Sequence, residues 1–361
     1  MDQKTPATLL ELATKSLLSN EPAAIHALEE LPRDTFVQFL TAAFLGGHKK
    51  VLKAMVRIWP FPCLHVGTLR VCESQYDNLE AMIDGLQILP AQISSFRYRQ
   101  IDKMPVCECV LQFLDMGCID HLEVDEIYLN EITTFLAQMT HLHRLSMSHI
   151  PFTSFMRRSF ETFLNHLVQM DTLQEISLSY CHTHRLHKLL RCLPPQLDAL
   201  YLSFCRLSNR DITVLSQSPA ATHLRLLSLS NVEISWELSE SFQTLLASVS
   251  GTLEYLQITS CLITDSTLTA VIPALSRCSH LCVFSFASNP ITMRVLTSLL
   301  QHLTNLTELK RVIYPVPVHC YEQLHDLSSL NQQKLSEVQA QLKAMLQAVK
   351  RHDMLWTTSP E

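Results

Sequence analysis

The residues whose types and spacing come closest to a chemical site are thiols and imidazoles. Cys181, His182, His184 and His187 fall within seven residues, and thiolates and imidazoles are the ligands that zinc prefers. The run 107–109 (Cys-Glu-Cys) adds two more thiols. No second ligand pair stands at zinc-finger spacing, so we expect no metal site.

Motifs for catalysis and for cofactor binding are missing. The chain has only six glycines, and the pair Gly46-Gly47 stands where a helix is expected to end. Glycine-rich phosphate loops of the GxGxxG or P-loop type are therefore absent. There is also no GxSxG nucleophile elbow and no HExxH helix. We expect a protein that is not an enzyme and needs no cofactor.

A repeated leucine pattern identifies the elements that must position any functional residue. Residues 173–181 (LQEISLSYC) recur as 197–205 (LDALYLSFC), and related segments begin at other leucines. The leading residues are Leu142, Leu173, Leu197, Leu224, Leu253, Leu281 and Leu306, spaced by 24 to 31 residues. This pattern is typical of leucine-rich repeats, in which one short strand and one helix form a unit. We predict an α/β leucine-rich-repeat solenoid, a horseshoe with parallel strands on its concave side.

Alternation along each strand predicts which side chains face outward. Most of these positions hold small hydroxyl residues, and the larger candidates for contacting a target protein are Arg144, Glu175, Tyr201, Tyr255 and Gln257. Aromatic residues contribute much of the binding energy at interfaces, so Tyr201 and Tyr255 are the expected anchors. Cys181, Cys205 and Cys261 occupy the repeat position at which Asn or Cys bonds the turn backbone, and we expect them to be structural.

Four segments are predicted along the chain. Residues 1–60 form a helical segment, with helices ending near 19, beginning at 22 and 32, and spanning 48–58. Residues 61–118 form a less regular helix and strand connection, with a helix at 75–89 and a polar connection at 97–105. The repeats occupy residues 119–314. Residues 315–361 provide a tail and a long helix at 321–350, which caps the open end of the repeats.

Composition excludes several classes of partner. The chain has 28 basic and 34 acidic residues without a basic block, so we expect no direct binding of nucleic acid. No apolar stretch approaches the roughly 18 residues that span a bilayer, and the first residues lack a signal-peptide core. The 12 cysteines show no paired framework. We expect a cytoplasmic protein, or one also present in the nucleus, with reduced thiols.

Short motifs that belong together occur throughout the chain, at residues 8–18, 27–33, 42–44, 52–56, 59–63, 215–219 and 314–317. They resemble the PRAME family, most closely the rodent oogenesin and PRAME-like germline proteins. The resemblance covers nearly the whole chain, with two departures. A short bridge at 93–109 replaces a longer family segment, and the family's cysteine-containing tail is absent after Pro360, as in a shortened member.

The resemblance implies a substrate receptor of a cullin-2-type RING ubiquitin ligase, docked through elongins B and C. The elongin-contacting helix of such receptors corresponds to Thr8, Leu9, Ala13 and Leu17, and the last three, spaced by four residues, share one helical face. The cullin-contacting segment begins with a leucine-proline pair, here Leu31 and Pro32. Thr35 stands where the family has leucine, and Phe36 and Phe39 could compensate for it. Spacing alone also permits a second interpretation, in which the first helix only covers the first repeat.

The alternative function is a transcriptional corepressor scaffold. The family is associated with repression of the retinoic acid receptor and with proliferation, differentiation and apoptosis, and LxxLL helices dock on nuclear receptors. Residues 186–190 and 296–300 match LxxLL, but repeat leucines at helical spacing are expected in the core. The looser match at Leu342 to Leu346 lies on the stripe that caps the last repeat, and a methionine weakens the motif. It is the only match that could be exposed, and its exposure would favour this alternative.

Overall fold

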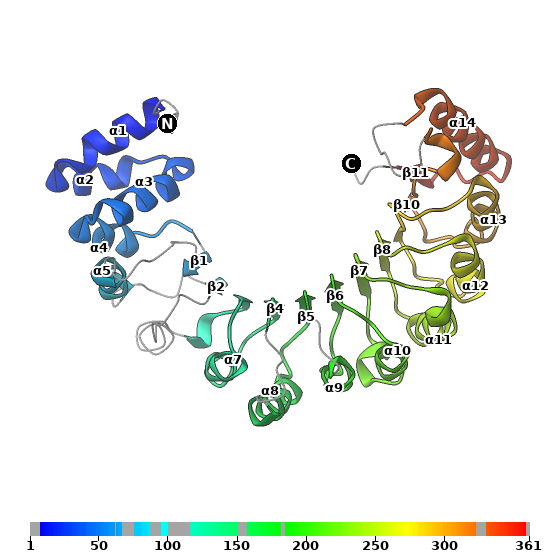
Figure 1. The fold of residues 1–361 in the computed structure, drawn as a ribbon, viewed down its shortest axis with the longest axis horizontal. Coiled ribbons are helices and arrows are strands. Elements are labelled where there is room, and N and C mark those ends of the chain that lie inside the picture. Colours follow the sequence, from blue (N-terminus) through cyan, green and yellow to red (C-terminus); the bar gives the residue numbers. More distant parts are fainter. Residues whose placement is uncertain are drawn as a thin grey trace. The chain divides into compact units, whose positions relative to one another are not determined.

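A computed structural model describes residues 8–61, 63–66, 76–86, 95–99, 116–150, 157–181, 185–322 and 330–358 (Figure 1). The chain divides into two compact units. The N-terminal unit comprises residues 1–127 and 134–142, and the C-terminal unit comprises residues 128–133 and 143–361. The helix α7, Leu129–Leu136, contributes to both units.

The N-terminal unit begins with a series of short helices, as predicted. They are α1 Leu9–Leu18, α2 Glu21–Ala27, the 3₁₀ turn Leu28–Glu30, α3 Arg33–Gly46 and α4 Lys49–Arg57. Asn20 caps α2 by accepting a hydrogen bond from the backbone N–H of Ala23. Gly47 ends α3 with a φ of 75°, a left-handed conformation that glycine adopts without a steric penalty.

Helix α5, Tyr76–Leu86, packs closely against α4. A Cβ atom on Gly85 would lie 2.8 Å from the carbonyl oxygen of Lys53, so only glycine permits this approach of the two backbones. Two ion pairs join the helices, Lys49 with Asp77 at 2.7 Å and Lys53 with Asp84 at 3.3 Å. The two helices therefore form one packed pair.

Three parallel strands complete the N-terminal unit. These are β1 Cys63–Val66, β2 Ser95–Arg99 and β3 His121–Asp125, and β2 pairs with both of the others. The predicted polar connection at 97–105 is therefore wrong in its first three residues, which belong to β2. The buried Phe96 explains the strand, because its ring packs on that of Phe135 at 5.5 Å.

The C-terminal unit contains eight strands in the described residues, all parallel and paired in chain order. They are β4 Arg144–Ser148, β5 Glu175–Ser179, β6 Ala199–Ser203, β7 Leu226–Ser230, β8 Tyr255–Thr259, β9 Val283–Ser285, β10 Arg311–Ile313 and β11 Leu355–Thr357. The helices are α8 Arg157–Gln169, α9 Leu186–Arg191, α10 Asn209–Ser216, α11 Ser239–Val249, α12 Asp265–Leu275, α13 Met293–Leu303 and α14 Gln332–Ala348. In Figure 1, α8 to α13 lie on one side of these strands. This is the predicted leucine-rich-repeat architecture.

The core of the C-terminal unit lies between the strands and the helices. Each strand turns alternate residues inward, and the inward residues of neighbouring strands form buried rows such as Leu145, Ile176, Leu200, Leu227, Leu256, Phe284 and Val312. The predicted turn-bonding cysteines are confirmed. The thiol of Cys261 donates to the carbonyl oxygens of Leu229 and Thr259, both at 3.3 Å, and Cys205 donates similarly to Leu178 and Ser203.

The end of the repeat array differs from the prediction in three ways. The register pairs Arg311 with Val283, so Leu309 and not Leu306 corresponds to the leading leucine Leu281. The last helix begins at Gln332 and not at 321, and Tyr321 instead forms a bridge with Leu330. An additional strand, β11, follows this helix. No helix in the described ranges has the length and apolar character needed to cross a membrane.

Candidate partner-binding surfaces

The first helix has a well-formed N-terminus. Thr8 caps α1 by accepting a hydrogen bond from the N–H of Glu11 at 3.3 Å, and the carboxylate of Glu11 accepts from the N–H of Thr8 at 2.7 Å. This reciprocal capping box satisfies two backbone donors that would otherwise lack partners. Local sequence therefore fixes where α1 begins, and it places Leu9 in the first turn.

Most apolar side chains of α1 are exposed. Leu9 is 88% exposed and Leu12 is 54% exposed, while Leu18 alone among the helix's leucines is buried. Ala13 is exposed and Leu17 is half-buried. A helix that serves only to cover a core turns its leucines inward. Leu9, Ala13 and Leu17 instead form an accessible stripe one helical turn apart.

The other side of α1 borders an open groove of about 570 Å³ within the N-terminal unit. Leu10, Thr14 and Leu18 line it from α1, and Ala42 and Leu45 line it from α3. Leu45 is 64% exposed. Helix α1 thus has accessible apolar atoms on two sides.

The predicted cullin-contacting residues divide into two groups. Pro32 is exposed and Leu31 is half-buried, so both can reach a partner. Phe36 and Phe39 are each only 2% exposed, and the prediction that they contact a cullin is wrong for this structure. The ring of Phe36 packs on Trp59 at 5.9 Å and on Phe61 at 6.2 Å. These rings stabilise the N-terminal unit, since burial there removes them from solvent.

The outward side chains of β4 to β9, here called the strand face, bring the predicted target-binding residues together. The register aligns Arg144 with Glu175 across β4 and β5, and both Tyr201 and Gln257 align with Ser228 of β7, on either side of that strand. Partial burial raises the pKa of Tyr201, and the nearby Glu175 and Tyr255 raise it further. Glu175, Tyr201 and Tyr255 therefore lie close enough to interact.

Gln257 links this cluster to the rest of the strand face. Its amide donates to the hydroxyl of Ser230 at 3.2 Å, and its carbonyl oxygen accepts from the hydroxyl of Tyr255 at 3.3 Å. Tyr255, Gln257, Glu175 and Tyr201 are all half-buried, and Arg144 is exposed. A half-buried, pre-oriented set of tyrosine and amide groups is suited to recognising a protein surface.

An aromatic stack beside the strand face was missed in the sequence. The rings of His149 and Tyr180 stack with centroids 4.2 Å apart, and those of Tyr180 and Phe204 stack at 4.5 Å. All three residues directly follow a strand and have φ between 50° and 55°, which turns their side chains outward. Tyr180 and Phe204 precede Cys181 and Cys205 in the repeated pattern, so their equivalence was visible in the sequence.

The leucine motifs offer no docking helix. Leu186, Leu189 and Leu190 of α9 are buried, as are Leu296, Leu299 and Leu300 of α13, in agreement with the prediction that they belong to the core. Leu342 and Leu346 are 1% and 8% exposed. Their burial agrees with the predicted cap on the last repeat, and the exposure that would favour a nuclear-receptor scaffold is not observed at these two leucines.

Metal binding has no support in the described residues, where no three His, Cys, Asp or Glu side chains gather around one point. Residues 182–184 and 107–109 lie outside the described ranges. The thiol of Cys181 is directed to the carbonyl oxygen of Ser179 at 3.7 Å, in keeping with a structural role.

Comparison with known proteins matches both parts of the chain to one family. The model of the PRAME N-terminal domain matches residues 6–114, and that of the PRAME C-terminal domain matches residues 91–360. PRAME family member 20 of Homo sapiens is 29% identical over 421 residues, with 89% of this chain and 88% of the relative covered. Oogenesin-3 of Mus musculus is 27% identical, covering 99% and 91% of the two chains.

A third relative, leucine-rich repeat-containing protein 14 of Rattus norvegicus, is 27% identical, with 97% of each chain covered. Its alignment extends over 478 residues, more than the 361 residues of this chain, so the relative has segments that this chain lacks. Both domain models, the repeat architecture and these relatives agree with the motifs noted in the sequence. The chain belongs to the PRAME family.

Proposed function

We propose that this protein is a non-catalytic adaptor that brings a target protein to a cullin-2-type RING ubiquitin ligase. In this proposal the stripe of Leu9, Ala13 and Leu17 on α1 binds elongin C, which is itself bound to elongin B. The strand face binds the target. The protein supplies proximity, because tethering raises the effective concentration of the target's lysines near the ubiquitin-conjugating partner.

The exposure of α1 is the observation that supports this proposal most strongly. Leu9 is 88% exposed and Leu12 is 54% exposed, and the hydration of their apolar surface is unfavourable. Burying each in a partner would contribute roughly 1.5–3 kcal/mol. The capping box holds the helix in place before binding, so little ordering free energy is lost on association. An amphipathic helix that lies in a partner's groove has these properties.

The cullin contact in this proposal depends on Leu31 and Pro32, since Phe36 and Phe39 are in the core. The predicted compartment, cytoplasm or nucleus, fits the free thiols of Cys118, Cys181, Cys192, Cys205, Cys261, Cys278, Cys282 and Cys320. The target is a protein whose surface complements the tyrosines and amide of the strand face.

Co-purification of the full chain with elongins B and C tests the proposal. We expect the wild type to retain both elongins and Leu9→Asp to lose them, because a carboxylate would have to enter an apolar groove. Val37→Asp is the matched control, since Val37 is 50% exposed on α3 and lies outside the α1 stripe. Circular dichroism establishes that each variant is folded. The proposal would be overturned if the wild type failed to retain the elongins, or if Val37→Asp lost them while Leu9→Asp retained them.

A further inference from the structure

The last strand of the C-terminal unit, β11, leaves the repeat core open at its end. Trp356 aligns with Val312 and thus belongs to the inward row that also contains Phe284. Every earlier member of this row from β4 onward is buried, whereas Trp356 is only half-buried. The reason is that a repeat normally covers the one before it, and the described residues place no strand beyond β11.

The backbone of β11 is equally open. Leu355 donates its N–H to the carbonyl oxygen of Lys310 at 2.7 Å, and Thr357 accepts from the N–H of Tyr314 at 2.9 Å. Successive residues of a parallel strand direct their backbone groups to opposite sides. The N–H and C=O of Trp356 therefore point away from β10, toward the side on which a further strand would pair.

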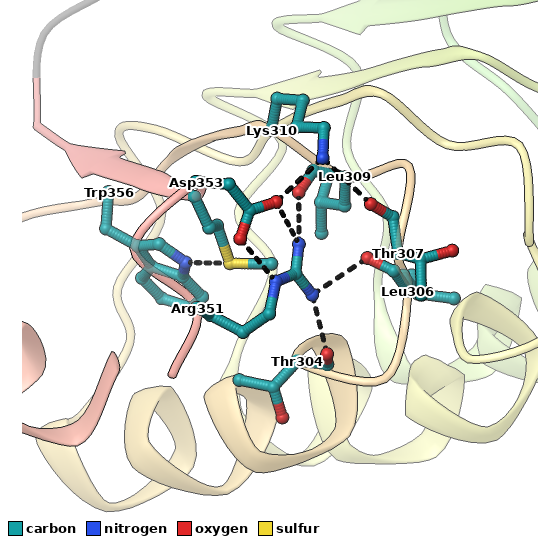
Figure 2. Close-up of polar contacts among 9 residues, drawn as sticks. Thr304, Leu306, Thr307, Leu309, Lys310, Arg351, Asp353 and Trp356 are labelled. Atoms are coloured by element: carbon teal, nitrogen blue, oxygen red, sulfur yellow. Dashed lines mark hydrogen bonds and ion pairs between the residues drawn. The ribbon is translucent and has the colours of Figure 1, made fainter. Parts of the chain in front are cut away.

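A groove of about 550 Å³ runs along this open end, between β11 and α14. Apolar atoms of Leu342, Leu346, Met354 and Trp356 line it. The indole N–H of Trp356 donates to the sulfur of Met354 at 2.8 Å, which fixes the ring (Figure 2). The groove is thus an apolar trough beside an open strand edge.

The structure around the groove is firmly held. Figure 2 shows Arg351 donating hydrogen bonds to the carbonyl oxygens of Thr304 at 2.6 Å, Leu306 at 2.9 Å and Leu309 at 2.7 Å. Asp353 accepts from both Arg351 and Lys310. These contacts join the segment before β11 to the end of α13 and to β10, so the groove does not depend on a bound partner to form.

The basic side chains that line the groove favour an acidic group on whatever binds there. Lys343, Arg351 and His352 line the groove, and none of its described lining residues is a carboxylate. Arg351 is committed to the carbonyl oxygens described above. Lys343 is exposed and has no ion pair or hydrogen bond in the described part of the chain, so it can attract an acidic group.

We infer that this end of the C-terminal unit binds an extended peptide segment of a partner protein. The segment pairs with the outer edge of β11 through the backbone of Trp356 and places an apolar side chain in the groove. An aspartate or glutamate two residues from that side chain, on the same face of the added strand, pairs with Lys343. Strand addition of this kind gains affinity from the backbone and specificity from alternate side chains. The inference is independent of α1 and of elongin binding.

A display library of random ten-residue peptides, selected against the full chain, tests the inference. We expect enriched peptides that carry an apolar residue and, two positions away, an Asp or Glu, so that both side chains face the groove. Lys343→Glu should weaken their binding about tenfold, whereas Lys350→Glu, a charge reversal outside the groove, should change it less than about twofold. Trp356→Pro, which removes the outward N–H and the indole, should abolish binding.

Three results would overturn the inference. The library could yield no enriched peptide, or the enriched peptides could bind Lys343→Glu and Trp356→Pro as tightly as the wild type. The chain could also self-associate in sedimentation velocity in a manner lost in Trp356→Pro, which would make a second copy of the chain the occupant. Circular dichroism of each variant distinguishes a lost site from a lost fold.

Discussion

Replacement of Asn289 by alanine should destabilise the C-terminal unit more than most single substitutions. Asn289 follows β9 at the repeat position that holds cysteine in three earlier repeats, and it is 3% exposed. Its side-chain oxygen accepts from the backbone N–H groups of Cys261 and Ile263, both at 3.0 Å. Its amide donates to the carbonyl oxygens of Ile258 at 2.8 Å and Phe286 at 2.7 Å.

The magnitude follows from the groups left without partners. Alanine leaves two buried N–H donors unsatisfied, and each such donor costs about 1–3 kcal/mol. Partial entry of water would reduce the total, so we expect a loss of about 3–5 kcal/mol in the free energy of unfolding. Asn289→Cys should lose less, because a thiol can donate to one of the carbonyl oxygens as Cys261 does.

Urea unfolding followed by circular dichroism measures this loss, with the denaturant slope checked for each variant because repeat proteins can unfold in parts. Asn305→Ala is the matched control, since Asn305 is exposed just after α13, and it should change stability by less than about 0.5 kcal/mol. A loss below about 1 kcal/mol for Asn289→Ala, or an equal loss for both variants, would refute the reasoning.

Three further predictions concern stability and thiol reactivity. In urea unfolding, Phe36→Ala should lower the free energy of unfolding by about 3–5 kcal/mol and Val37→Ala by less than about 1 kcal/mol. The reverse order would contradict the burial of Phe36. Arg351 and Lys310 hold the pKa of Asp353 well below its usual range, so its stabilising contribution is present above about pH 5 and is lost as pH falls through and below about 4. The difference in melting temperature between wild type and Asp353→Asn should therefore be constant above about pH 5 and should shrink progressively as the pH falls below about 4. A difference that stays constant at low pH would contradict this. Burial raises the pKa of Cys261 to about 11 and that of Cys278 to about 12, so mass spectrometry after iodoacetamide treatment at pH 8 should find the exposed Cys118 modified and these two protected until urea is added.

The repeat architecture could be predicted because its signal is redundant. Leucines at the same position of successive repeats all serve one buried row, and a mismatch in one repeat does not hide the others. Redundancy ends at the last repeats. Leu306 and Leu309 both fit the pattern, and only the pairing of Arg311 with Val283 selects Leu309. Strand β11 has Asp353 at the position of the leading leucine, so no pattern marked it.

The partner-binding residues were harder to predict because an apolar pattern does not say which apolar residues are exposed. Helix α3 carries Phe36, Val37, Phe39 and Leu45, and the structure buries the two phenylalanines while leaving the other two exposed. The choice depends on Trp59 and Phe61, which contact Phe36 from a later segment. On α1 the predicted face has Leu9 and Ala13 exposed and Leu17 half-buried.

The most direct test of the adaptor proposal is hydrogen exchange of the full chain with and without elongins B and C. If α1 is the elongin-binding element, its amides from Leu12 to Leu18 should gain strong protection on complex formation, and Leu9→Asp should abolish that gain. Protection that appears elsewhere while α1 is unchanged, or no protection at saturating elongin, would contradict the account and leave α1 as a structural cap.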